Sequence, residues 1–421
     1  MKTKASLRNI TAGLLLGLLT TTATAQKYVG GDISLLTKYE ENGSKYFDYY
    51  GKAISSPLAF FKAEGMNAMR VRLFVDPSKA SSEDKGQGVC QDLAYVKALG
   101  KRIKEAGLHF MLDLHYSDSW ADPAKQWTPS SWLGLSDEQL YTKIYDYTKD
   151  VLTQLNAVGA TPDFIQTGNE ISYGMLWGKE GSSANRCYSG NNANWGRFTT
   201  LLKNAGKACR EVCPNAKIVI HTERAANTGV LRNFYTQMDN ANLDYDIIGL
   251  SYYSYFHGKL NVLESALNTL ETSFPNKKIM IVEAGYPLKW AVPGTTIDYT
   301  SEYPYTDAGQ KKFTDDLIAL LNKHPHVNGL FWWWMEANEY GRTGSSQVTS
   351  SWYNAPLFDN QTGRATSALS EMRKFITEDA AVGLIEAEEN EDGHWYTIDG
   401  RQVSEPTKGI YIHGGKKQIV R

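Results

Sequence analysis

Several features that mark common protein classes are missing from this sequence of 421 residues. After the first 25 residues, no stretch is long and apolar enough to cross a bilayer as a helix. The chain has no block of basic residues, so nucleic acid and anionic membranes are poor candidates for partners. The stretch "VGGDISLLTKYEENG" also lacks the G-x-G-x-x-G pattern of a dinucleotide-binding loop.

Motifs for metal binding and for a serine nucleophile are missing as well. His115 and His221 do not have H-E-x-x-H spacing, and "GNEIS" lacks the serine of a nucleophile elbow. The cysteines contain no C-x-x-C pair, so one or two disulfides in an oxidising compartment are favoured over a zinc site. The sequence therefore predicts no metal and no other cofactor. The disulfide pairing stays open among Cys90, Cys187, Cys209 and Cys213.

The first 25 residues are typical of a secretory signal peptide. Lys2, Lys4 and Arg8 precede the apolar run "ITAGLLLGLLT", and small residues end at Ala25 before Gln26. No cysteine follows the expected cleavage site, so a lipid anchor is not predicted there. This segment holds three of the 44 basic residues and none of the 46 acidic ones, which leaves five more acidic than basic residues in the rest. These features predict a secreted, periplasmic or cell-surface protein without an integral membrane segment.

Eight short strand-like runs alternate with helix-like stretches along the middle of the chain. Such alternation predicts a parallel (β/α)8 TIM barrel, with a doubly wound open sheet as the main competitor. Gly65, Gly107 and Gly159 follow three of the helices, as C-terminal glycines do. The predicted strands are 28–34, 67–75, 109–117, 163–170, 217–223, 246–253, 278–285 and 328–334. The predicted helices include 56–65, 93–107, 137–159, 197–213, 260–274, 308–324 and 365–377.

The character of the chain changes after Thr377. Residues 378–392 hold seven acidic side chains and no Lys or Arg, and the remainder alternates like short strands with glycine turns. The remainder is similar to the C-terminal sorting tails of some secreted bacterial enzymes, and a small structural appendage is the alternative. We therefore predict a signal peptide at 1–25, a barrel at 26–377, an acidic linker at 378–393 and a small β-rich tail at 394–421.

Polar side chains collect on one register of the predicted strands. In "FMLDLHYS", for example, Leu112 and Leu114 alternate with Asp113 and His115. In a barrel the apolar register suits the surrounding helices, and the other register points inward toward the end that carries active sites. A buried network that only fixes the fold is the alternative, but many buried charges seldom contribute net stability. The inward set is Asp32, Arg72, Asp113, His115, Glu170, Glu223, Tyr253, Glu283 and Trp333.

Two carboxylates in this set suit cleavage of a glycosidic bond. Glu170 ends the fourth predicted strand and Glu283 ends the seventh, so they face each other across an eight-stranded barrel. One acid can protonate the leaving oxygen while the other attacks or activates water. A retaining pair needs a gap of about 5–5.5 Å and an inverting pair roughly 6.5–9.5 Å.

Tryptophans in or near the predicted strand-to-helix loops support a sugar ligand, because flat indoles stack on sugar faces. For any one of them, ordinary packing is an equal alternative. Trp332 and Trp334 are expected to face the helices. The candidates are Trp120, Trp127, Trp132, Trp177, Trp195, Trp290, Trp333 and Trp352.

These motifs give the chain a resemblance to glycoside hydrolase family 53, the endo-β-1,4-galactanases, in a clan of retaining (β/α)8 glycosidases. The matching stretches are "GGDIS", "GMNAMRVRLFVDP", "LDLHYSDSWADPAKQ", "IQTGNEISYGMLW", "DIIGLSYYSYFHG" and "IVEAGYP". They run in order from about residue 28 to residue 376, and the tail lies outside them. The resemblance implies cleavage of β-1,4-galactan, as in the type I arabinogalactan side chains of pectin.

The resemblance also implies roles for single residues. Glu170 would be the general acid/base (the proton donor), and Glu283 would be the nucleophile. Asn169 would hold the sugar 2-hydroxyl in the −1 subsite, Trp333 would form its floor, and Asp32 would bind substrate or brace the site. Arg72, His115 and Tyr253 would orient Glu283 and tune its charge.

The chain departs from the family pattern at two places. Some members bind calcium in the loop after the seventh strand, but residues 287–309 hold no close cluster of acidic ligands, so calcium is not predicted. The last strand reads "FWWWMEANEYG", where the family often has one Trp followed directly by Glu. The alternatives are a related retaining glycosidase acting on mannan or glucan, and a non-catalytic glycan-binding barrel. We expect a monomer.

Overall fold

The structure is a computed structural model that describes the barrel region and parts of the tail. The described residues are 26–188, 194–349, 354–377, 394–397, 402–404, 406, 409–413 and 416–420. The predicted signal peptide, the acidic linker and Trp352 lie outside them. The domain boundaries at these segments therefore remain predictions.

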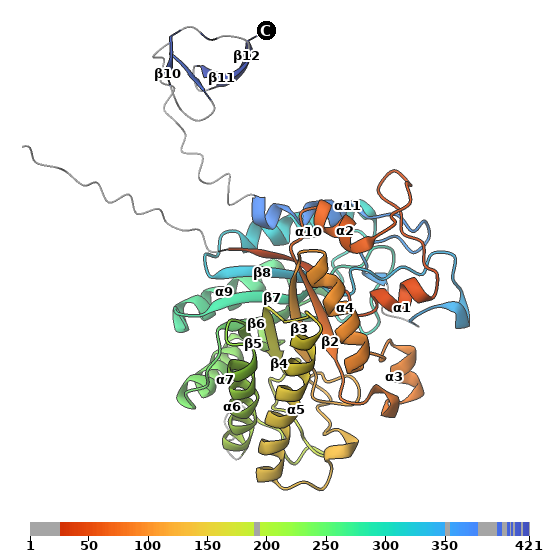
Figure 1. Cartoon of the computed structure of the whole chain (residues 1–421), viewed down its shortest axis with the longest axis vertical. Helices are drawn as coiled ribbons and strands as arrows, with labels where there is room; N and C mark the ends of the chain where they lie inside the picture. The colour runs from red at the N-terminus through yellow and green to blue at the C-terminus, as the bar shows by residue number, and fades with distance from the viewer. Residues whose placement is uncertain are drawn as a thin grey trace, which may run out of the picture.

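Eight parallel strands close into a barrel in the order of the chain, which confirms the predicted (β/α)8 fold (Figure 1). The barrel closes where β1 pairs with β8, with Val29 opposite Leu330. Each strand lies inside its predicted range or within one residue of it. The strands are β1 (Tyr28–Asp32), β2 (Ala68–Leu73), β3 (His109–Leu114), β4 (Phe164–Thr167), β5 (Lys217–Thr222), β6 (Ile247–Tyr252), β7 (Lys278–Ala284) and β8 (Val327–Trp332).

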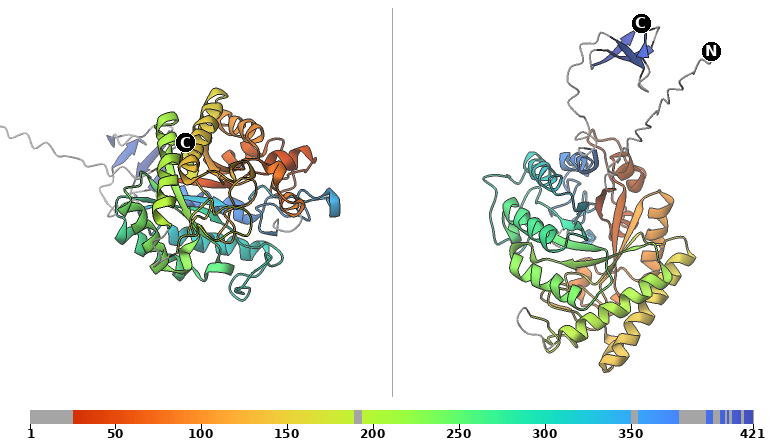
Figure 2. Two further views of the ribbon diagram at one scale, coloured as in Figure 1. Left: turned by 90° about the horizontal axis from the view of Figure 1, so that it is seen from below. Right: turned by 90° about the vertical axis from the view of Figure 1, so that its left-hand side faces the viewer.

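Helices surround the barrel on the outside of the strands (Figure 2). The predicted helices are present, and the structure adds α1, α3, α7 and α8, which the sequence analysis did not identify. The helices are α1 (Leu36–Glu41), α2 (Pro57–Ala63), α3 (Ser82–Gly86), α4 (Leu93–Glu105), α5 (Asp137–Ala157), α6 (Trp195–Val212), α7 (Thr228–Asn240), α8 (Ser254–His257), α9 (Leu260–Ser273), α10 (Asp307–Leu321) and α11 (Ser367–Glu371). Short 3₁₀ turns occupy Pro77–Lys79, Ser130–Trp132, Arg224–Ala226 and Gly344–Ser346.

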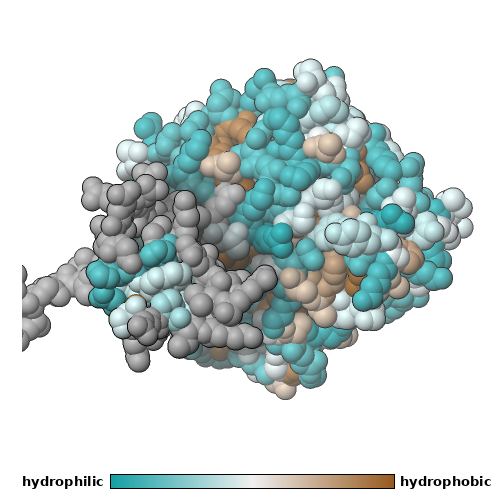
Figure 3. Space-filling view, turned by 90° about the horizontal axis from the view of Figure 1, so that it is seen from above, coloured by the Kyte–Doolittle hydropathy of each residue, from teal (hydrophilic) through white to brown (hydrophobic). Residues whose placement is uncertain are grey.

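The helix α5 illustrates how local sequence sets these elements. Ser136 and Gln139 form a capping box, in which each side chain accepts a hydrogen bond from the backbone N–H of the other residue. Leu140, Ile144 and Val151 then form a buried stripe on one side of the helix, while the other side carries charged residues. The opposite end of the molecule, seen from above in Figure 3, is also mostly hydrophilic where it is coloured, with small scattered apolar patches.

Two apolar regions make up most of the core, and a small third cluster joins Phe74, Ala80 and Val89 after β2. The larger lies between the strands and the helices, where the outward strand register meets the helix stripes. The smaller fills the inside of the barrel with one or two residues from each of β2 to β8. We call it the barrel floor: Ala68, Met111, Phe164, Val219, Ile247, Met280, Val282 and Phe331.

One glycine of the inward register is required by a close approach of two strands. A Cβ atom on Gly30 would lie 1.7 Å from the carbonyl oxygen of Ala68 on β2. The absence of a side chain there lets β1 pair closely with β2 and brings the next inward residue, Asp32, opposite Arg70.

The predicted β-rich tail is also present as a small antiparallel sheet. Its strands are ordered β10 (Gln402–Val403), β9 (Trp395–Thr397), β11 (Gly409–His413) and β12 (Lys416–Val420). The ring of Trp395 stacks on His413 with centroids 4.2 Å apart. In the described part of the chain, no helix has both the length and the hydropathy of a membrane span.

Candidate active site

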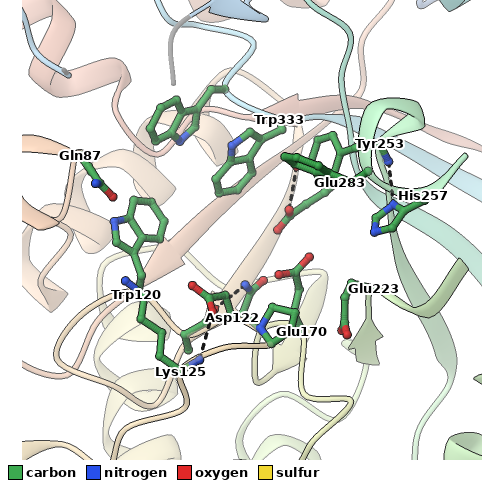
Figure 4. Close-up of a pocket in the computed structure, with 15 residues that line it drawn as sticks. Gln87, Trp120, Asp122, Lys125, Glu170, Glu223, Tyr253, His257, Glu283 and Trp333 are labelled. Carbon is green, nitrogen blue, oxygen red and sulfur yellow. Dashed lines mark hydrogen bonds between the residues drawn. The ribbon is translucent and has the colours of Figure 1, made fainter. Parts of the chain in front are cut away.

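A cavity of about 380 Å³ opens at the end of the barrel where the strands finish. The loops after β2, β3, β4, β5, β6 and β8 contribute to its wall, together with Glu283 of β7. Both predicted carboxylates lie in it, and Figure 4 shows them pointing toward each other. The lining residues are Gln87, Trp120, Ala121, Asp122, Pro123, Lys125, Asn169, Glu170, Glu223, Tyr253, Phe256, His257, Glu283, Trp333 and Trp334.

Asn169 and Glu170 stand on a tight turn directly after β4. The strand ends at Thr167, Gly168 has a φ of 104°, and Glu170 has a φ of 49°. A left-handed φ at a residue other than glycine is uncommon and is typical of functional turns. The backbone N–H of Glu170 donates to Nδ1 of His221 at 3.3 Å, which holds the turn against β5. The turn projects the Glu170 side chain into the cavity.

The side chain of Asn169 is held on both of its polar atoms. Its Nδ2 donates to the carbonyl oxygen of Ala121 at 2.9 Å, and its Oδ1 accepts from Nη2 of Arg70 at 2.9 Å. These contacts fix the orientation of the amide next to Glu170. Asn169 therefore presents a rigid polar group at the bottom of the cavity.

Glu283 is the last residue but one of β7, at a point where the pairing register with β6 shifts by one residue. The shift falls between Leu250 and Ser251 and brings Glu283 opposite Ser251. The hydroxyl of Tyr253 donates to Oε2 of Glu283 at 2.9 Å, and Nη2 of Arg70 lies 3.1 Å from its Oε1. A cation and a hydroxyl donor at one carboxylate stabilise its ionised form.

Arg70, rather than Arg72, is the arginine that contacts Glu283. Its guanidinium is fully buried and also lies 2.8 Å from Asp113 and 3.3 Å from Asp32. Arg70 and Arg72 share the inward register, and Arg70 lies one step deeper, where the carboxylates of neighbouring strands converge. The sequence analysis selected Arg72 and not Arg70 as a site residue.

Arg72 and His115 support the site through other groups. Arg72 pairs with Asp32 at 3.1 Å, and its guanidinium lies 4.5 Å from the ring centroid of Trp120 and 5.4 Å from that of Trp333. Nε2 of His115 lies 3.1 Å from Asp113. Their expected orienting role on Glu283 is thus indirect, through Asp32 and Asp113, which both bind Arg70.

The expectation that Trp334 faces the helices is wrong. Trp333 and Trp334 both line the cavity, and their rings stack with centroids 5.6 Å apart and an interplanar angle of 13°. The reason is that β8 ends at Trp332 and Trp334 has a φ of 50°, so strand alternation no longer applies. Trp332 is buried and donates from Nε1 to the carbonyl oxygen of Ala355, as an outward residue does.

The other tryptophan candidates divide between the core and the surface. Trp120 lines the cavity beside Trp333. Trp132, Trp177 and Trp195 are buried in the core, and Trp127 packs edge-on against Trp177. Trp290 is exposed.

Burial and neighbouring charges affect the pKa values of the two central carboxyl groups, Glu170 and Glu283, differently. Burial raises the pKa of Glu170 well above its usual range, and the charges of Glu283 and Glu223 raise it further. Burial also raises the pKa of Glu283 to about 7, while Arg70 and the Tyr253 hydroxyl act to lower it. The charge of one carboxylate makes ionisation of the other less favourable, so the pair holds one proton near neutrality. That proton resides on Glu170, because the groups that favour negative charge contact Glu283.

Gln166 and His221, which the sequence analysis did not select as site residues, contact the polar residues at the base of the cavity. Gln166 lies between Asp113 and Asn169, and its Nε2 lies 3.2 Å from Oδ1 of Asn169. His221, which accepts from Glu170, has its Nε2 2.8 Å from Oγ of Ser251. Both occupy inward positions on β4 and β5, so the alternation that selected the other polar residues could have found them.

The comparisons with known proteins agree with this geometry. The family model described as glycosyl hydrolase family 53 matches residues 28–372. The chain belongs to that family. It is therefore a glycoside hydrolase, as its sequence resemblance implies.

Relatives and solved structures give the same result. A probable arabinogalactan endo-β-1,4-galactanase A from Neosartorya fischeri is 31% identical over 77% of this chain and 89% of its own length. The family 53 catalytic domain from Ignisphaera aggregans is 31% identical, with a TM-score of 0.72 over 83% of this chain and 96% of its own. A structure from a study of two fungal β-1,4-galactanases is 28% identical, with a TM-score of 0.69 over 83% of this chain and 100% of its own.

The structure contains no disulfide, since all four cysteines are in its described part and all are free thiols. Three of them are buried: Cys187, Cys209 and Cys213. In the described residues, no group of three or more His, Cys, Asp or Glu side chains has the arrangement of a metal site.

Replacing Arg70 by methionine should destabilise the protein strongly at pH 7. The variant Arg70→Met would leave Asp32, Asp113 and Glu283 buried without their common cation, at a cost of about 3–5 kcal/mol. Urea unfolding measures this cost. The matched control is Arg102→Met, which breaks a half-exposed pair with Glu40 and should cost less than about 1 kcal/mol. Equal losses for the two variants would contradict the central role of Arg70.

Proposed function

We propose that this protein is an endo-acting β-1,4-galactanase that retains the configuration of the sugar at the cleaved bond. The observation that carries the proposal is the pair of carboxyl groups, Glu170 and Glu283, facing each other in an open cavity of a family 53 barrel. The names of the relatives supply the substrate class. The tryptophans in the cavity wall suit a polysaccharide chain.

In the first step, Glu283 attacks the anomeric carbon and Glu170 gives its proton to the leaving oxygen. The bond from the anomeric carbon to that oxygen breaks, a glycosyl ester forms on Glu283, and the shortened chain leaves with a new hydroxyl. Arg70 and Tyr253 keep Glu283 ionised and orient it for attack. Burial keeps the proton on Glu170 until the transition state requires it.

In the second step, Glu170 acts as a base. The negative charge of Glu283 is lost in the ester, so one cause of the high pKa of Glu170 disappears and the carboxyl can stay ionised. It removes a proton from water, which attacks the anomeric carbon and releases Glu283. The two displacements restore the original configuration.

The surrounding residues divide between substrate contact and support. Asn169 is fixed beside Glu170 and would bind the 2-hydroxyl of the sugar in the −1 subsite. Trp333, stacked on Trp334, would form the floor of that subsite. Arg72, His115 and Asp32 would support these groups without touching the reacting atoms.

Removing the nucleophile should abolish cleavage of linear β-1,4-galactan. Wild-type protein should release short galacto-oligosaccharides, and Glu283→Ala should lose at least about 10⁴-fold in activity. Chromatography of the products measures both. The control is Glu302→Ala, an exposed glutamate in the loop after β7, which should keep full activity. Products from mannan or cellulose alone would replace the substrate and keep the mechanism, while activity in Glu283→Ala would refute the site.

The activity should follow a bell-shaped dependence on pH. Since burial raises the pKa of Glu283 to about 7, kcat/KM should fall as pH falls through that value and the nucleophile becomes protonated. It should fall again at higher pH as Glu170 loses its proton. The variant Glu170→Gln, assayed on an aryl β-galactobioside that needs no acid, should lose the alkaline fall and keep the acidic one. An acidic midpoint near the ordinary glutamate value of ~4.3 would contradict the effect of burial.

We also propose that the protein is exported, on the basis of the pattern in its first 25 residues. Expression of the full chain in a secreting host, followed by N-terminal sequencing of the exported protein, should find Gln26 as the first residue. Retention of residues 1–25 on an exported chain would refute the cleavage site.

A further inference from the structure

The two ends of the active-site cavity differ in chemistry. In Figure 4, Trp120 and Trp333 lie on one side of the carboxylate pair, whereas Glu223 and His257 lie on the other. The first end is aromatic and suits stacking on sugar faces. The second offers a carboxyl group and an imidazole, which bind hydroxyl groups. A polysaccharide lying across the pair would have one neighbouring sugar in each environment.

Glu223 presents an oxygen that has no partner within the protein. It follows β5 and is 7% exposed. Its Oε1 accepts from Oγ of Ser172 at 2.6 Å and lies 3.0 Å from Nε of Arg224. Its Oε2 is buried and forms no hydrogen bond with any residue that the structure describes. A buried polar atom without a partner costs free energy, and a ligand that supplies the missing hydrogen bond recovers it.

His257 provides a donor at the same end of the cavity. Its Nδ1 accepts a hydrogen bond from the backbone N–H of Tyr253 at 3.0 Å. Burial lowers the pKa of His257 to about 4, so the ring is neutral near pH 7. Since Nδ1 accepts, the single ring proton lies on Nε2, which can donate. Glu223 and His257 thus form a pair that can accept and donate at once, as recognition of a hydroxyl requires.

The position of Glu223 and His257 in the cavity determines which sugar of the substrate they contact. Glu170 protonates the oxygen of the leaving sugar, so that sugar lies on the Glu170 side of the cleaved bond. Glu223 is close enough to Glu170 that its charge contributes to the raised pKa of the acid. Trp333 and Asn169 are proposed above to hold the other sugar, in the −1 subsite. The leaving sugar is therefore left with the Glu223 end.

We propose that Glu223 and His257 form the +1 subsite and bind a hydroxyl group of the leaving galactose. This inference rests on the proposed function and names the residues that select the sugar on the acid side. A site built to hydrogen-bond a hydroxyl discriminates strongly against ligands that lack one, since its polar groups are then left unpaired. The pair would also bind the acceptor when a second sugar, instead of water, attacks the ester on Glu283.

The test separates sugar binding from an effect on the proton of Glu170. The ester is formed from an aryl β-galactobioside, whose leaving group carries no sugar hydroxyl. Added β-1,4-galactobiose then competes with water for the ester, and Glu170 serves both acceptors as the base. Glu223→Ala should lower the ratio of transfer to hydrolysis by roughly 10- to 100-fold, the value of one hydrogen bond to a charged group. Glu223→Gln keeps an acceptor oxygen and should lose less.

Cleavage of galacto-oligosaccharides should fall in parallel, and an unchanged circular dichroism spectrum shows that the variants fold. The matched control is Glu180→Gln, an exposed glutamate in the loop after β4, which should change neither ratio. An unchanged transfer ratio in Glu223→Ala, with or without slower cleavage of oligosaccharides, would overturn the proposal. Failure of wild type to cleave galacto-oligosaccharides would instead refute the proposed substrate, and the same ratio would then be measured with the oligosaccharide that is cleaved.

Discussion

The arrangement of the site depends on one buried guanidinium. Arg70 contacts Asp32 from β1, Asp113 from β3 and Glu283 from β7, and it also donates to Asn169 after β4. Without it, three acidic side chains would be enclosed with no shared counter-charge. Buried charge clusters are poor sources of stability, so the cluster is better explained by what it does to Glu283. Arg70 acts to lower the pKa of Glu283 against the effect of burial, which raises that pKa to about 7.

The two central glutamates have the same side chain, and their surroundings give them different roles. Glu283 lies against a cation and a hydroxyl donor, whereas Glu170 lies among other carboxyl groups, including Glu223 and Asp122. Arg70 and Tyr253 limit the rise in the pKa of Glu283 to about 7, whereas burial and the neighbouring carboxylates raise the pKa of Glu170 well above its usual range. Residues on the neighbouring strands and loops therefore set the different protonation states of the two glutamates. If the two environments were exchanged, the protonation states would be exchanged as well.

Much of this could be predicted from the sequence, because strand alternation is a strict geometric rule. The inward register identified Asp32, Asp113 and His115, and the alternation of elements indicated the barrel. Glu283 was assigned to the same register, but Met280 and Val282 are the inward residues of β7, and Glu283 lies at a register shift that the sequence pattern does not show. The rule was less useful at the ends of strands. Trp334 lies in the cavity because its backbone leaves the strand conformation, which no two-residue period can show.

The depth of a residue along its strand is a second property that the alternation of the sequence does not predict. Arg70 and Arg72 have the same residue type and face the same way, and only the stagger of neighbouring strands decides which of them reaches Glu283. The unpaired oxygen of Glu223 is a similar case. The register placed the residue inward, but its partners Ser172 and Arg224 come from loops, whose paths the sequence pattern does not specify.

The apolar barrel floor affects how protons can reach the active site. It packs Met111, Phe164, Met280 and Phe331 beneath the ionised cluster, and none of these side chains carries an ionisable group. Glu170 lines the cavity in which the polysaccharide would bind, so the opening of that cavity connects the acid with solvent. A polysaccharide that fills that opening would limit the access of solvent to Glu170. The departure of the leaving fragment then does two things at once, because it clears the product and admits the water that completes the cycle.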